Sequence, residues 1–195
     1  MGSRALAFAA LLAPVWGLAA DLDGVSLEND VVVDGHALHL NGLGLRTRYF
    51  FKVYVAGLYL PRKATTAEAA IAEHGAKRIV LVMRRDATAE QFCAAIDAGL
   101  RANNSEAQLA RVQPQTEALY GMIRAASYAR NGMKIVLDYV PSSGATTLYG
   151  DGRPLGPPMP GEDFFRALLR IWLGERPVQD DLKALLLGQR QTVAD

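Results

Sequence analysis

Three polar side chains stand in or beside one apolar stretch of the sequence, residues 49–60. Arg46 comes just before the stretch, two residues after Gly44, and Lys52 and Tyr54 lie inside it. Alternate residues of an extended strand share a face, so all three are expected on one side. A cation beside a tyrosine on an apolar wall suits a pocket for an anionic or phenolic apolar ligand. In the alternative interpretation, Arg46 and Arg48 are solvated and Lys52 reaches solvent past its apolar neighbours.

The histidines and the cysteine do not form a pattern that indicates a metal or a nucleophile. His36 and His39 point to opposite faces of a predicted strand, and His74 is distant in sequence. A metal site needs three or four convergent ligands, so no metal is predicted. Cys93 is the one cysteine of the chain, which excludes an intrachain disulfide, and its apolar neighbours indicate a buried hydrophobic role.

The usual sequence motifs of hydrolases and nucleotide-binding proteins are absent, and no cofactor is predicted. The segment Gly42-Leu43-Gly44 is followed by a strand pattern, whereas a phosphate-binding loop needs a helix there. We therefore interpret this segment as a sharp turn.

The order of the predicted elements indicates an α+β fold with a mostly antiparallel sheet and helices on one side. The stretch 49–60 is rich in aromatic and β-branched residues and apolar on both faces, which predicts a central strand. The other predicted strands fall within 25–40, 78–83, 134–140 and 145–149. The predicted helices span 66–74, 88–102, 103–126 with a break near Pro114, 163–173 and 178–187.

Residues 1–20 read as a signal peptide, followed by one domain over residues 21–195. Arg4 precedes an apolar run from Ala5 to Leu18, and small residues before Asp21 favour cleavage after Ala19 or Ala20. The alternative is an uncleaved membrane anchor, but Pro14 and Gly17 interrupt the short run. The expected location is periplasmic or secreted, with no stable membrane span after cleavage.

The composition is typical of an ordinary globular domain with almost no net charge. The 21 basic residues are balanced by 20 acidic ones, and 50% of residues are hydrophobic. This balance argues against an overall electrostatic field that would attract nucleic acid or an anionic membrane.

Three segments together resemble one known family. They are the run Gly42–Arg46 followed by Phe51–Leu60, the segment Arg84–Glu90, and the segment Pro160–Val178 that continues into Asp181-Leu-Lys-Ala-Leu. These residues resemble the chalcone isomerase-like family, in particular its exported bacterial branch. The resemblance implies the chalcone isomerase fold, a large antiparallel sheet covered by a layer of helices with a ligand cleft between them.

The resemblance also implies a set of site residues. In the plant enzymes an arginine, a threonine, a tyrosine and an asparagine bind the ligand and polarise its carbonyl. Arg46 stands at the arginine position, Tyr54 replaces the threonine, and Thr88 and Ala95 fall at the last two positions. The expected ligand-binding residues are Arg46, Lys52, Tyr54 and Thr88. Arg46 and Tyr54 are the catalytic candidates if the protein is an enzyme.

Three functions remain open at this point. The first is an exported binder of a small apolar anion, such as a fatty acid or a phenolic compound. The second is an intramolecular lyase of the chalcone isomerase type, which holds its substrate in the cyclising geometry and stabilises an enolate. The third is a non-catalytic envelope protein that acts through a protein partner.

Overall fold

The computed structural model of the chain describes residues 19–189. The predicted signal peptide therefore lies outside the described residues, except for Ala19 and Ala20. These two residues begin strand β1 (Ala19–Leu22). In the part of the chain that the structure describes, no helix is long and apolar enough to cross a membrane.

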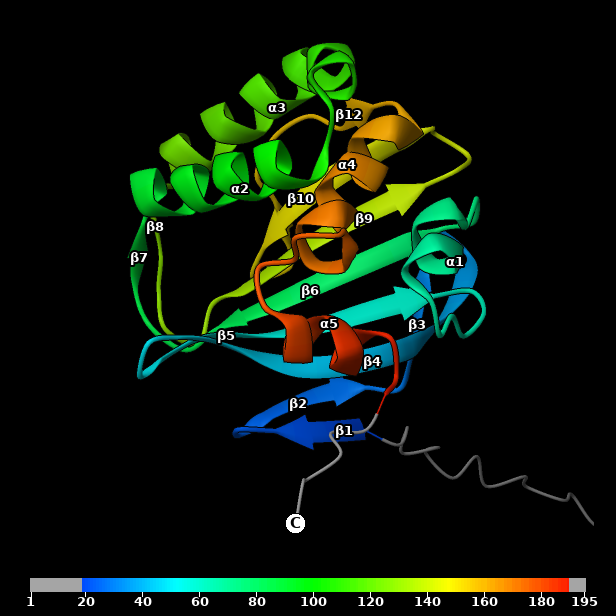
Figure 1. The fold of residues 1–195 in the computed structure, drawn as a ribbon, viewed down its shortest axis with the longest axis vertical. Coiled ribbons are helices and arrows are strands. Elements are labelled where there is room, and N and C mark those ends of the chain that lie inside the picture. Colours follow the sequence, from blue (N-terminus) through cyan, green and yellow to red (C-terminus); the bar gives the residue numbers. More distant parts are fainter. Residues whose placement is uncertain (1–18, 190–195) are drawn as a thin grey trace, which may run out of the picture.

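The centre of the molecule is a curled eight-stranded sheet in which every neighbouring pair of strands is antiparallel (Figure 1). The strands along the sheet are β11 (Arg153–Pro154), β10 (Ala145–Gly150), β9 (Lys134–Val140), β6 (Lys77–Met83), β5 (Phe51–Leu60), β4 (His36–Arg48) and β3 (Asp30–Val33), and β12 (Met159–Pro160) pairs with β10. Two small antiparallel pairs lie outside the sheet: β1 with β2 (Val25–Glu28), and β7 (Ala87–Thr88) with β8 (Tyr128–Ala129).

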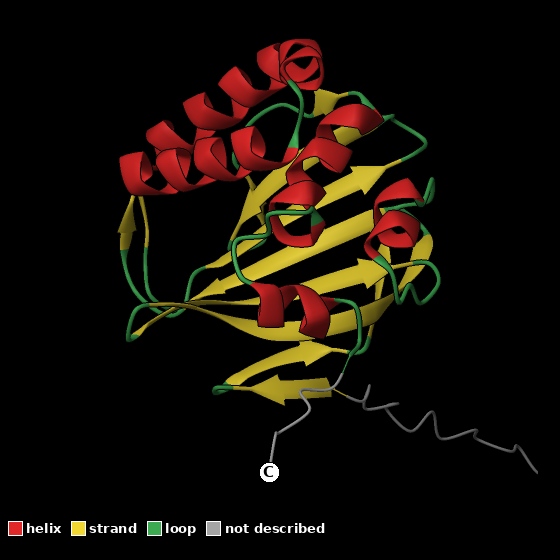
Figure 2. Cartoon of the chain, in the orientation of Figure 1, coloured by secondary structure: helices red, strands yellow, loops and turns green. Residues whose placement is uncertain are grey.

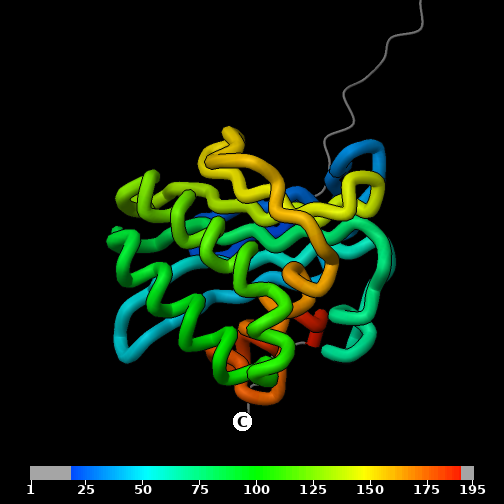
Figure 3. Tube along the Cα trace, turned by 90° about the horizontal axis from the view of Figure 1, so that it is seen from above, coloured from blue at the N-terminus to red at the C-terminus, as the bar shows by residue number. Residues whose placement is uncertain are grey.

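The helices lie on one face of the sheet, as Figures 2 and 3 show from two directions. They are α1 (Ala67–Ala72), α2 (Ala89–Asn103), α3 (Glu106–Ala126), α4 (Glu162–Leu173) and α5 (Asp180–Leu186). Helix α4 packs between the sheet and the pair α2–α3, so most of its side chains are buried. The α+β prediction with one helical layer is confirmed.

Strand β5 is apolar on both faces because it separates two hydrophobic cores. Ala56, Leu58 and Leu60 belong to the core beneath the helices. Val55 and Tyr59 belong to the core on the opposite face, which the β1–β2 hairpin covers. The prediction of a central strand buried on both sides is therefore confirmed.

The predicted turn at Gly42–Gly44 is wrong, because β4 runs through it without a break. A side chain on Gly42 would place its Cβ 2.0 Å from the Leu185 carbonyl oxygen, and one on Gly44 would meet Leu182 at 2.6 Å. The glycines therefore allow helix α5 to lie directly on the strand, a close approach that any Cβ would prevent.

The helix break expected near Pro114 and the expected start of the central strand also differ from the structure. Helix α3 continues through Pro114, where proline cannot donate to the Ala110 carbonyl. Both residues are exposed, so that carbonyl faces solvent and the helix is not broken. Strand β5 begins at Phe51 rather than at residue 49, because Tyr49 adopts a left-handed φ of 54° in the turn between β4 and β5.

Candidate functional site

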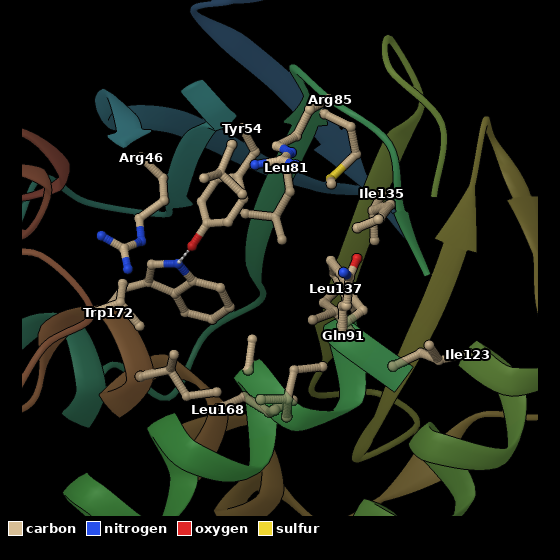
Figure 4. Close-up of a pocket in the computed structure, with 18 of the residues that line it drawn as sticks. Arg46, Tyr54, Leu81, Arg85, Gln91, Ile123, Ile135, Leu137, Leu168 and Trp172 are labelled. Atoms are coloured by element: carbon tan, nitrogen blue, oxygen red, sulfur yellow. Dashed lines mark hydrogen bonds between the residues drawn. The ribbon is translucent and has the colours of Figure 1, made fainter. Parts of the chain in front are cut away.

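An apolar cavity of about 250 Å³ lies between the sheet and helices α2, α3 and α4 (Figure 4). Leucine and isoleucine side chains from both layers form its walls, among them Leu81, Ile96, Ile123, Ile135, Leu137 and Leu168. The strands supply alternate residues and the helices supply one apolar stripe each, so the walls follow from the periodicity of these elements.

Arg46 and Tyr54 meet at one end of this cavity. The register of the sheet places Arg46 of β4 opposite Tyr54 of β5, and both side chains line the cavity. Figure 4 shows the guanidinium group of Arg46 beside the phenol ring. The structure thus brings together the two residues that the sequence singles out most strongly.

The hydroxyl of Tyr54 has a fixed partner in helix α4. The indole Nε1 of Trp172 donates a hydrogen bond to the Tyr54 oxygen at 3.0 Å. An indole N–H can only donate, so the Tyr54 hydroxyl keeps its own hydrogen for another acceptor. Burial raises the pKa of Tyr54, and this effect exceeds the lowering by Trp172 and by the charge of Arg46. The phenol is therefore neutral at pH 7 and able to donate.

Gln179, at the start of α5, fixes the position of Arg46. Nη1 of Arg46 donates to Gln179 Oε1 at 3.0 Å and to the Thr47 carbonyl at 2.7 Å. Gln179 also accepts from the Thr47 amide at 2.8 Å and donates to the Leu45 carbonyl at 3.2 Å. These bonds occupy both hydrogens of Nη1. They leave the edge formed by Nε and Nη2, which suits a carboxylate.

Lys52 does not share the face of Tyr54. The pairing of β4 with β5 shifts between Arg46–Tyr54 and Thr47–Lys52, which leaves Val53 as an extra residue. Such a bulge breaks the alternation of faces, so Val53 and Tyr54 both line the cavity and Lys52 turns away. Its ammonium group forms an ion pair with Asp23 in the β1–β2 turn.

Thr88 also lies outside the cavity wall. It caps α2: its hydroxyl accepts from the Gln91 amide at 3.2 Å, and the Gln91 side chain accepts from the Thr88 amide at 3.1 Å. Gln91, one turn further along α2, reaches the cavity instead. Ala95, at the position of the plant asparagine, lines the cavity with a methyl group only.

Sequence reasoning missed several residues that line the cavity. Trp172 is the most important of them, and a signal for it exists. It follows Leu168 by four residues on a strongly apolar helix, and a buried indole needs an acceptor for its N–H. Arg48 and Arg85 were also missed; they line the cavity near the β4–β5 turn.

The histidines do not gather into a metal site. His39 contacts Asp30 at 2.5 Å, and His74 contacts Glu162 at 3.4 Å on another part of the surface. Within residues 19–189, no group of three or more His, Cys, Asp or Glu side chains could hold a metal ion. Cys93 is buried, and burial raises the pKa of its thiol, which disfavours the reactive thiolate.

Comparison with known proteins identifies the family. The model of the chalcone isomerase-like family matches residues 19–188 of the sequence. The chain belongs to the chalcone isomerase-like family. Its family domain thus extends from β1 to the end of α5.

A solved structure has the same chalcone isomerase-like architecture. The crystal structure of a fatty-acid binding protein from Arabidopsis thaliana resembles the present one with a TM-score of 0.66. The match covers 87% of this chain and 96% of that protein, with 13% sequence identity. At this identity the likeness shows a shared fold, and the predicted fold is confirmed. No curated protein matches the sequence at a significant level.

Proposed function

We propose that this chalcone isomerase-like protein binds a small apolar anion, a fatty acid or a phenolic compound, in the cavity between sheet and helices. One observation carries the proposal: a cation, Arg46, and a neutral hydroxyl donor, Tyr54, stand together at the end of an apolar cavity. The apolar walls of such a cavity favour the burial of an apolar chain, and its polar end favours a carboxylate or phenolate. The plant structural relative is a fatty-acid binding protein, which supports the same class of ligand.

The charge of Arg46 is available to such a ligand. Among the described residues, no carboxylate forms an ion pair with Arg46, and its two hydrogen-bond acceptors are neutral. A partly buried guanidinium without a counter-ion favours a bound anion. The carboxylate would accept from the Nε–Nη2 edge of Arg46 and from the hydroxyl of Tyr54.

The cavity volume favours a short chain. An apolar cavity of about 150 Å³ takes up benzene, so one of about 250 Å³ has room for roughly ten carbon atoms. We therefore propose a medium-chain acid or a single-ring phenolic acid. A longer chain would extend through the opening beside Arg48 and Arg85.

The alternative of an intramolecular lyase has weaker support. Of the four positions taken over from the plant enzymes, Arg46 keeps its residue type, Tyr54 offers a hydroxyl, Ala95 offers no polar group, and Thr88 is engaged in capping α2. Loss of donors to a developing enolate costs about tenfold in rate per ~1.4 kcal/mol. Cyclisation of a chalcone above its spontaneous rate, abolished by Arg46→Ala, would favour this alternative.

We further propose that the protein belongs to the exported branch of its family and acts in the periplasm or outside the cell. The apolar run Ala5–Leu18 and the small residues before Asp21 support this location. N-terminal sequencing of the protein from its own host tests it. A mature chain that begins at residue 20 or 21 is expected, and an intact Met1 would contradict export.

Native mass spectrometry of the protein purified from its own host tests the binding function. We expect a mass added by an apolar acid, lost in Arg46→Ala and retained in the control Arg101→Ala. Arg101 is an exposed residue of α2 paired with Asp97, away from the cavity. A protein that carries no ligand, binds no added acid and instead retains one envelope protein would favour the third function.

A further inference from the structure

The turn between β4 and β5 exposes three consecutive aromatic residues. Phe50 is 100% exposed, Tyr49 84% and Phe51 58%. Figure 3 shows this hairpin as a cyan loop that projects from the edge of the molecule. Exposed aromatic side chains that gather at one place usually mark an interaction site rather than a folding core. We refer to Tyr49, Phe50 and Phe51 as the aromatic tip.

The backbone of the aromatic tip is held in a conformation that normally favours glycine. Tyr49 has a φ of 54°, in the left-handed region, although its side chain makes no buried contact that would compensate. A bulky residue at such a φ costs on the order of 1 kcal/mol. A tyrosine at this position therefore calls for a role outside the fold.

Cations surround the aromatic tip. Arg48 lies over the ring of Tyr49 at 5.7 Å, and Arg85 lies over the ring of Phe51 at 4.9 Å. Three more cations lie on adjoining segments: Lys52 in β5, Arg84, whose amide donates to the Val53 carbonyl, and Arg130, in the loop whose Gly132 amide donates to the Met83 carbonyl. Asp23 pairs with Lys52 and Arg84, and Asp86 binds the Asn131 amide. Five cations against two carboxylates leave this end of the molecule positively charged, although the whole chain is nearly neutral.

The cavity reaches solvent beside the aromatic tip, because Arg48 and Arg85 line the cavity and are themselves exposed. Arg48 and Arg85 stack on tip aromatics and line the cavity, whereas Phe50 and Phe51 do not line it. A surface that covers the tip therefore lies directly in front of the cavity opening.

We propose that the aromatic tip docks on the surface of a bilayer that contains anionic phospholipid. Aromatic rings with a neighbouring cation suit the headgroup region, where the ring enters the apolar boundary and the guanidinium binds phosphate. A narrow projecting turn fits a soft bilayer, whereas a protein partner requires a broader complementary surface. This proposal adds a route for the ligand to the proposed function: docking would let an apolar acid pass between bilayer and cavity without crossing water.

Vesicle sedimentation tests the docking. The full chain is mixed with vesicles of phosphatidylcholine alone or of phosphatidylcholine with phosphatidylglycerol at 3:1. We expect binding to the anionic vesicles, weakened by added salt. Phe50→Ser should weaken it about tenfold through lost apolar contact. Arg130→Gln should weaken it about fivefold.

Two matched controls show whether vesicle binding depends on the aromatic tip itself or on any exposed apolar or charged side chain. Val32→Ser removes a 70% exposed apolar side chain from β3, and Arg62→Gln removes an exposed cation beyond the opposite end of β5. Neither should change vesicle binding. F50W adds a direct readout, because its fluorescence should shift to shorter wavelength on anionic vesicles only.

The docking and the ligand are tested separately. Phe50 and Arg130 do not line the cavity, so Phe50→Ser and Arg130→Gln should leave the affinity for decanoate unchanged. Vesicle binding that is equal in wild type, Phe50→Ser and Arg130→Gln would overturn the docking proposal, whatever the ligand result. A dimer in sedimentation velocity that Phe50→Ser abolishes, without vesicle binding, would assign the tip to a second copy of the chain instead.

Discussion

The indole nitrogen of Trp172 and the hydroxyl of Tyr54 lie 3.0 Å apart at the polar end of the cavity, although 118 residues separate them in the sequence. This bond joins helix α4 to strand β5 and sets the orientation of the Tyr54 hydroxyl. The oxygen already accepts from Trp172 (Figure 4), so the hydroxyl hydrogen is available to a bound anion.

Trp172→Phe should weaken decanoate binding about fivefold, the effect of one hydrogen bond of ~1 kcal/mol. Phenylalanine keeps an aromatic ring in the wall but leaves Tyr54 without its donor. Calorimetric titration measures the affinity. Tyr54→Phe should cost a similar factor, and the double variant little more than either, because both changes remove one unit. Fully additive losses would show that the two residues act independently.

Gly42→Ala should destabilise the fold by more than about 2 kcal/mol, since the new methyl group would overlap the backbone of α5. Gly121→Ala is the control: it lies in helix α3 with open space around it, and alanine there should stabilise by about 0.5–1 kcal/mol. Urea unfolding measures both variants. Equal stability of wild type and Gly42→Ala would mean that α5 does not rest on β4.

Features that depend on residues close together in the sequence were predictable, whereas features that depend on contacts between distant segments were not. The two-sided burial of β5 and the capping of α2 by Thr88 follow from short-range patterns and were predictable. The glycines of β4 looked like a turn because the helix that needs them comes about 140 residues later; Asn41, beside them, bonds to Leu186 across 145 residues.

The prediction of the candidate site was limited in a similar way, because it depends on how the strands pair. Arg46 and Tyr54 share a face as predicted, but they lie opposite each other on two neighbouring strands and not along one extended strand, as the prediction assumed. The position of Lys52 depends on one extra residue, Val53, in the pairing of β5 with β4. A bulge of this kind leaves no mark in hydrophobic periodicity, yet it reverses the face of every residue beyond it.

Stability should fall in acid through Glu162. Its carboxylate accepts from the fully buried ammonium of Lys77 at 2.8 Å. Burial alone would raise the pKa of Glu162, but the hydrogen bond from Lys77 and the charges of Lys77 and Arg166 bring it below the usual 4.5. A carboxyl group whose pKa is lower in the folded than in the unfolded state stabilises the fold at pH values above its unfolded pKa. This stabilisation is lost as the pH falls through the folded pKa.

Urea unfolding between pH 7 and pH 3 measures this effect. Glu162→Gln should cost about 3 kcal/mol at pH 7, because it leaves Lys77 buried without a counter-ion, and should flatten the loss of stability in acid. Asp163→Asn, next to it and largely exposed, should change stability by less than about 0.5 kcal/mol. An unchanged acid transition in Glu162→Gln would assign the transition to other carboxyl groups.

Tyr49→Gly should raise stability and weaken vesicle binding in the same protein. Glycine accepts the φ of 54° without strain, so thermal unfolding should show a gain of about 0.5–1 kcal/mol. The loss of one ring from the aromatic tip should reduce binding to anionic vesicles. A less stable variant would mean that the tyrosine serves the fold, contrary to its exposure.

Paired titration of decanoate and decanol into wild type and Arg46→Ala tests the binding site most directly. The two ligands share an apolar chain and differ in the charge that Arg46 and Tyr54 would bind. We predict that wild type binds decanoate at least tenfold more tightly than decanol, and that Arg46→Ala binds the two about equally. Equal affinities in wild type, or a preference for the acid that survives Arg46→Ala, would contradict the assignment of the polar end of the cavity.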